Sequence, residues 1–240
     1  MSRIPVTGKD TTDNILSYLF KKVCIELNIN NVTWHRLLDN YVNNPLFLKI
    51  EGMTVKNEQR EIKRRASLRS NLDTSLTSHN MTIDNFVKGI RMLKPDTSIL
   101  RVEIELPKKH VVKEASQRII STSVNLPIYA QETSHGAILA TMLKELHDGI
   151  SPNKEETKLL TELFLTDPCN GISEDKKLKS SASSNLIRSL TSDRLTWTNF
   201  QRCLYYLRPF RIKVSLDLSW KFPKKTTGHS VEFKPNFLRG

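Results

Sequence analysis

The side chains best suited to chemistry in this 240-residue chain are cations that lie close to aromatic rings near its C-terminal end. Residues 194–240 hold ten Lys or Arg but only two Asp or Glu, and Phe210, Trp220 and Phe222 stand close to several of these cations. Lysine and arginine neutralise phosphate groups, and aromatic rings can stack on exposed bases. The segment therefore predicts contact with a polymer of phosphates, although each ring taken alone is more typical of a core.

A second basic feature occurs twice, each time before the tripeptide Ser-Asn-Leu. Lys63 and Arg65 precede the copy at 70–72, and Lys177 and Lys179 precede the copy at 184–186. Serine and asparagine there either bond phosphate oxygens or cap a helix. The adjoining cations favour phosphate. We expect one shared surface of phosphate contacts, with Trp220 as a stacking candidate; the contacts are Lys63, Arg65, Lys177, Lys179, Arg208, Arg211, Lys213, Lys221, Lys224 and Lys225.

A repeat in the chain relates these two basic features. Ser-Asn-Leu followed by Ser-Leu-Thr-Ser at 70–78 recurs 114 residues later at 184–192, and the match continues to Pro95 and Pro209. A weaker upstream match keeps the apolar pattern at a spacing of 123 residues. A repeat at this scale indicates a structural unit used more than once. We interpret the chain as an internal duplication with units at 11–125 and 134–240, joined near 126–127, and chance similarity is the alternative.

Each unit passes from helical to strand periodicity. Apolar residues recur at helical spacing in 15–27, 34–42, 62–76 and 83–93, and again in 197–207. The expected N-caps of these helices are Asp13, Thr33, Thr82 and Thr196. Alternation with a period of two predicts strands at 101–106 and 211–218, with return strands at 118–124 and 229–233. The predicted fold class is α+β, with three to four helices followed by a β-hairpin in each unit.

The partner is left open among three hypotheses. Few base-reading side chains accompany the cations, so we expect a grip on the backbone with weak sequence preference, and the rings favour RNA or single-stranded DNA. A winged-helix arrangement is the alternative, with 196–207 as a recognition helix and 221–225 as a wing on duplex DNA. The third hypothesis is a structural or adaptor protein of a larger assembly, for example a virion, with an acidic protein partner.

Other functional classes find little support in the sequence. The net charge is +12, from 37 basic and 25 acidic residues, and the three cysteines lie far apart. No glycine-rich phosphate loop and no HExxH motif occurs, so we expect no enzyme, no cofactor, no metal site and no small-molecule substrate. No apolar run of about 18 residues and no apolar leader is present, which predicts a cytoplasmic protein away from membranes.

Overall fold

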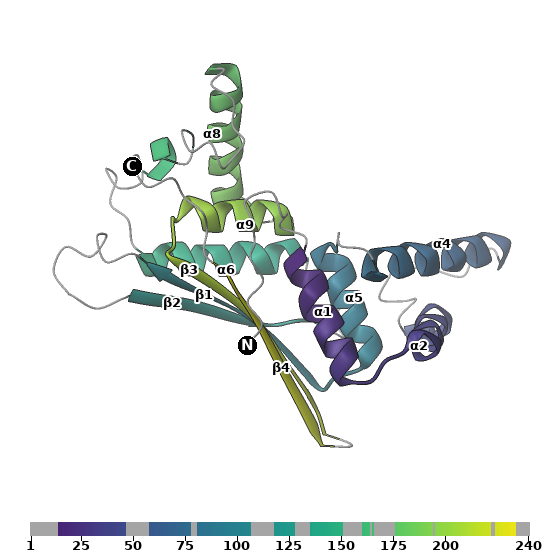
Figure 1. Ribbon diagram of the computed structural model, residues 1–240. Coiled ribbons are helices and arrows are strands. Elements are labelled where there is room, and N and C mark those ends of the chain that lie inside the picture. The colour runs from purple at the N-terminus through teal and green to yellow at the C-terminus, as the bar shows by residue number, and fades with distance from the viewer. Residues whose placement is uncertain are drawn as a thin grey trace.

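The computed structural model has helices packed on one side of a four-stranded antiparallel sheet (Figure 1). The predicted α+β class is confirmed at this level. The residues that the structure describes are 14–46, 58–77, 81–106, 118–127, 135–150, 160–163, 165, 176–193, 195–221 and 224–233.

Helices precede a hairpin in each half of the chain. The first half contains α1 (Asn14–Glu26), α2 (Asn31–Asn43), α4 (Glu58–Thr77), α5 (Ile83–Leu93), β1 (Thr97–Leu106) and β2 (Arg118–Asn125). The second half contains α6 (His135–Ile150), α8 (Lys176–Thr191), α9 (Trp197–Tyr206), β3 (Arg211–Trp220) and β4 (Lys225–Phe233). The strands predicted from alternation thus lie within β1 to β4.

The two hairpins join into one sheet with the strand order β2-β1-β3-β4. The central strands β1 and β3 run antiparallel, with Val102 opposite Val214. Side chains alternate across a strand, so Val102 and Val214 share the buried face, while Arg101 and Lys213 lie on the other face. The outer strand of each hairpin forms one edge of the sheet.

Each half of the chain contributes a helix that packs against a strand of the other half. Helix α1 packs against β4, which belongs to the hairpin of the second half, and α6 packs against β2 of the first half. Residues from both halves consequently form one hydrophobic cluster. The predicted division at 126–127 falls between β2 and α6.

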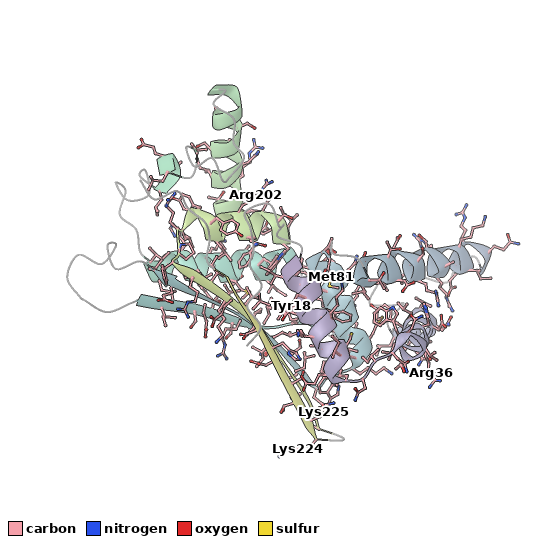
Figure 2. The ribbon with its side chains drawn as sticks, viewed as in Figure 1. Tyr18, Arg36, Met81, Arg202, Lys224 and Lys225 are labelled. Carbon is pink, nitrogen blue, oxygen red and sulfur yellow. The ribbon has the colours of Figure 1, made fainter. Side chains whose placement is uncertain are left out.

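Helices α4 and α8 extend outward beyond the rest of the helical layer (Figure 1). The C-terminal half of α4 buries Leu72 and Leu76 against the body, and Met81 lies near this inner end (Figure 2). Its N-terminal half exposes Ile62, Lys63 and Arg64. The basic half of α4 is therefore the half that projects.

Side-chain caps define where several helices begin. Thr82 Oγ1 accepts a hydrogen bond from Asn85 N at 3.2 Å, and Thr196 Oγ1 accepts one from Asn199 N at the same distance, as predicted. Helix α2 differs from the prediction, because Asn30 rather than Thr33 is its cap: Asn30 Oδ1 accepts from Thr33 N at 2.8 Å. The predicted cap of α1, Asp13, lies outside the described residues.

Candidate nucleic-acid interface

The predicted contacts on β3 have carboxylate partners on the neighbouring strands. Arg211 Nε lies 3.1 Å from Glu105 Oε2, and its Nη1 lies 3.6 Å from Glu232 Oε2. Lys213 Nζ lies 3.2 Å from Glu103 Oε2. The C-terminal segment is poor in acids, but β1 supplies them from more than 100 residues away. The charges of Arg211 and Lys213 are therefore balanced on the sheet, and their contact with phosphate stays a prediction.

The cations of α4 divide into a packed group and an exposed group. Arg65 pairs with Glu61 and donates a hydrogen bond to Asn43 Oδ1 at 3.3 Å, which ties α4 to α2. Among the side chains that the structure describes, Lys63 and Arg64 are exposed and form no ion pair. Lys63 therefore remains a candidate contact, whereas Arg65 has a structural partner.

A further cation of α4 joins the same interface with α2. Arg69 Nε donates a hydrogen bond to Asp39 Oδ1 at 2.6 Å, and this bond raises the pKa of the Arg69 guanidinium. Trp34 Nε1 donates to Asp73 Oδ1 at 2.9 Å on the same interface. Polar contacts thus hold α2 against the inner part of α4.

Lys177 and Lys179 lie on α8, but the described residues do not include their side chains. Helix α8 has four basic residues and no acidic residue in its 16 positions. The Ser-Asn-Leu copies fall inside α4 and α8, so they do not cap either helix. Part of the repeat has a packing role, because Asn85 Nδ2 donates to Ser75 Oγ at 2.7 Å between α5 and α4.

The turn between β3 and β4 is bonded to the connection between α5 and β1. Lys221 N donates to Asp96 Oδ2 at 2.5 Å, and Asp96 N donates to Ser219 O at 2.8 Å. Trp220 is half-buried, and its Nε1 donates to Leu93 O at 3.0 Å. The indole therefore anchors the hairpin to α5, which is a packing role.

Four lysines lie at this junction or next to it in the chain, and we call them the hairpin-end cluster: Lys94, Lys221, Lys224 and Lys225. Lys94, Lys221 and Lys224 are exposed and Lys225 is half-buried, and none of the four has an ion pair among the described residues. Asp96 lies at the same junction, where it accepts the Lys221 backbone N–H. Lys94 was missed in the sequence, where the signal was Lys-Pro at 94–95 matching Arg-Pro at 208–209.

The predicted contacts do not form one surface. Lys224 and Lys225 lie at the lower tip of the molecule in Figure 2, far from Arg202 on α9. Helix α4 extends to the right and α8 upward in Figure 1. Arg211 and Lys221 are separated by the whole of β3, about 30 Å at a rise of ~3.3 Å per residue. Arg208 is half-buried and precedes the other end of that strand. The predicted contacts thus lie on separate parts of the described structure, and their contact with phosphate stays a prediction.

The helix expected to enter a DNA groove, α9, is a core element, and so is α5, which the repeat matches to it. In α9 the side chains of Trp197, Phe200, Gln201 and Leu204 are buried, and α5 is buried over most of its length. A recognition helix must present an exposed face to base edges. The winged-helix arrangement is accordingly not confirmed.

Comparisons with protein-family models, curated proteins and solved structures give no match.

Within the described ranges, no three His, Cys, Asp or Glu side chains are grouped so as to hold a metal ion. No helix among the described segments is long and apolar enough to cross a bilayer. Burial raises the pKa of the Cys24 and Cys203 thiols to about 12, which disfavours their thiolates at neutral pH. The features that single out the hairpin-end cluster are the positive charge of its four lysines and the exposure of three of them.

Proposed function

We propose that this protein binds nucleic acid through its phosphate backbone, without catalysis and with weak sequence preference. The observation that carries the proposal is the contrast between two sets of cations. Arg211 and Lys213 are paired with carboxylates, whereas none of the four lysines of the hairpin-end cluster has an ion pair among the described residues. Unpaired cations at one junction attract a polyanion and release its counterions on binding.

Backbone contact is favoured over base reading by the chemistry of the cluster. Lysine is a flexible point charge, so it neutralises phosphates but gives little geometric selection. Trp34, Trp197 and Tyr206 are buried, and Trp220 is anchored to α5. Phe210 is exposed, but it lies just before β3, at the opposite end of that strand from the hairpin-end cluster. The rings near the cluster therefore give little reason to favour single strands, and both RNA and DNA, single-stranded or duplex, belong in the proposal.

The projecting helices are proposed as additional contacts. Lys63 and Arg64 are exposed on the outer half of α4, and the sequence places Lys177 and Lys179 near the start of α8. Arg65, Arg211 and Lys213 are left out of the proposed contacts because they have carboxylate partners. Arg208 stays a sequence-based prediction.

We also propose that the two halves are copies of one unit. Their matching positions share local geometry. The capping hydrogen bonds of Thr82 and Thr196 have the same length, and Lys94 and Arg208 both have positive φ angles in the left-handed region. Two backbone hydrogen bonds also correspond at the spacing of 114 residues, namely Asp96 N to Ser219 O and Phe210 N to Glu105 O. Chance similarity would not account easily for all three.

The test compares two double charge reversals with equal change in net charge. Lys224→Glu with Lys225→Glu alters the cluster, and Lys144→Glu with Arg202→Glu alters exposed cations elsewhere. Binding is measured by fluorescence anisotropy on labelled RNA, single-stranded DNA and duplex DNA of about 20 nucleotides, at about 50 and 200 mM salt. The cluster variant is expected to bind at least about tenfold more weakly at low salt, and the control within about threefold of wild type.

Two results would contradict the proposal. If the wild-type protein binds none of the three polymers at low salt, the function is wrong. If both variants lose affinity equally, net charge rather than the cluster governs binding.

An adaptor role is retained as a second candidate because of exposed apolar side chains. Ile25, Val32 and Leu46, on or next to α1 and α2, are each more than half exposed. Exposed apolar groups of this kind can mark a protein interface when they form a contiguous patch. Retention on heparin without a shift of any labelled nucleic acid would favour the adaptor.

A further inference from the structure

Lys94 has a backbone conformation that is unfavourable for a lysine. It follows α5 with φ 50° and ψ 49°, in the left-handed region, and its N–H donates to Arg91 O at 3.1 Å. This region is unfavourable for an ordinary L-residue, and glycine or asparagine usually occupies such a helix end. The following Pro95 disfavours right-handed helical geometry at Lys94.

The residues on both sides of Lys94 are bonded to the hairpin. Leu93 O accepts from the Trp220 indole, and Asp96 both accepts from Lys221 N and donates to Ser219 O. Lys94 lies between these two attachments in the chain and is itself exposed. Its backbone is therefore held beside the β3–β4 turn, although it is more than 120 residues away in the sequence.

We propose that Lys94 contacts backbone phosphate together with Lys221, Lys224 and Lys225, and that its left-handed backbone positions it for this contact. The inference rests on the proposed function and names a contact residue of the same site. The site then needs both halves of the chain, since Lys94 belongs to the first half and the other three lysines belong to the second. A peptide of the hairpin alone would lack the fourth cation.

A purely structural role for Lys94 predicts different effects of the same substitutions. A cation after the last turn of a helix interacts favourably with the carbonyl end of the helix dipole. That role concerns stability, whereas phosphate contact concerns affinity and its salt dependence. Asparagine tolerates the left-handed region and is neutral, and arginine keeps the charge, so the two substitutions separate the roles.

The experiment measures duplex DNA binding and thermal unfolding of Lys94→Asn, Lys94→Arg and the control Lys144→Asn in the full chain. Lys94→Asn is expected to bind about three- to tenfold more weakly at low salt. The slope of log K against log salt, which is negative, is expected to become less steep by about one. Lys94→Arg and Lys144→Asn are expected to bind within about twofold of wild type. Unfolding temperatures report whether any loss follows from instability.

The outcomes separate this inference from the proposed function. Wild-type affinity in Lys94→Asn, or an equal loss in Lys94→Arg, would overturn the assignment of Lys94. If Lys224→Glu with Lys225→Glu weakens binding while Lys94→Asn does not, only the Lys94 inference fails. If the wild-type protein binds no nucleic acid, both fail.

Discussion

At the scale of the residue, the partner of each charged group decides what that group can do. Arg69 and Asp39 hold α4 against α2, and Lys213 pairs with Glu103 across two strands. Exposed ion pairs of this kind contribute modestly to stability, because water screens the charges. Each such pair nevertheless makes its cation less available for contact with a ligand. The lysines of the hairpin-end cluster have no such partner among the described residues.

A pH-dependent contribution is expected from the pair between Asp84 at the start of α5 and His135 at the start of α6. The hydrogen bond with His135 lowers the pKa of Asp84, so the folded state favours the carboxylate. This contribution is present above the pKa of an unfolded aspartate, about 3.9, and is lost as pH falls through the lower folded value.

The corresponding variant is Asp84→Asn, examined by urea unfolding. It should lower the free energy of unfolding by less than about 1 kcal/mol near neutral pH, because the Asp84 side chain is largely exposed. The difference from wild type should shrink as the pH approaches about 3. A difference that is unchanged at acidic pH would exclude a role for the charged carboxylate.

At the scale of the element, close packing at two glycines brings helices against their neighbours. A Cβ on Gly89 of α5 would lie 2.7 Å from Phe20 Cε2 and 3.0 Å from Leu76 Cδ2, in α1 and α4. A Cβ on Gly149 of α6 would lie 2.6 Å from Ile120 Cγ2 in β2. These distances are below normal contact, so glycine is needed for the approach of the elements.

Alanine at either glycine is expected to destabilise the protein by about 1–3 kcal/mol through overpacking. Helix propensity alone predicts the opposite sign, since alanine stabilises a helix interior by about 1 kcal/mol relative to glycine. Denaturant unfolding of Gly89→Ala and Gly149→Ala distinguishes the two effects. If Ile120→Ala relieves the destabilisation caused by Gly149→Ala in a double-mutant cycle, the contact between positions 149 and 120 is identified. A gain of stability in the single glycine variants would refute the overpacking.

At the scale of the whole molecule, the exchange of helices makes the halves depend on each other. The partner of α1 is β4, and the partner of α6 is β2, so each half lacks a covering helix when it is alone. The central pairing of β1 with β3 also joins the halves. Burial of apolar surface, the main stabilising term, is therefore shared between them.

Separated fragments 1–127 and 134–240 are expected not to fold alone, because each would expose an apolar sheet face and an unpaired central strand. Mixed or co-expressed, they should associate and recover the unfolding transition of the intact chain. Circular dichroism and size-exclusion chromatography of each fragment and of the mixture provide the measurement. A cooperative transition in either isolated fragment would contradict this dependence.

Local sequence determined the elements of this protein, and only the tertiary structure decided which of its cations are unpaired. Periodicity of two placed the strands, and Thr82 and Thr196 marked two helix starts, because both signals act within a few residues. The partners of Arg211 and Lys213 and the position of Lys94 beside the hairpin depend on strand pairing and hydrogen bonds between residues more than 100 positions apart. No short-range pattern encodes such contacts, since they arise only when the two hairpins join into one sheet.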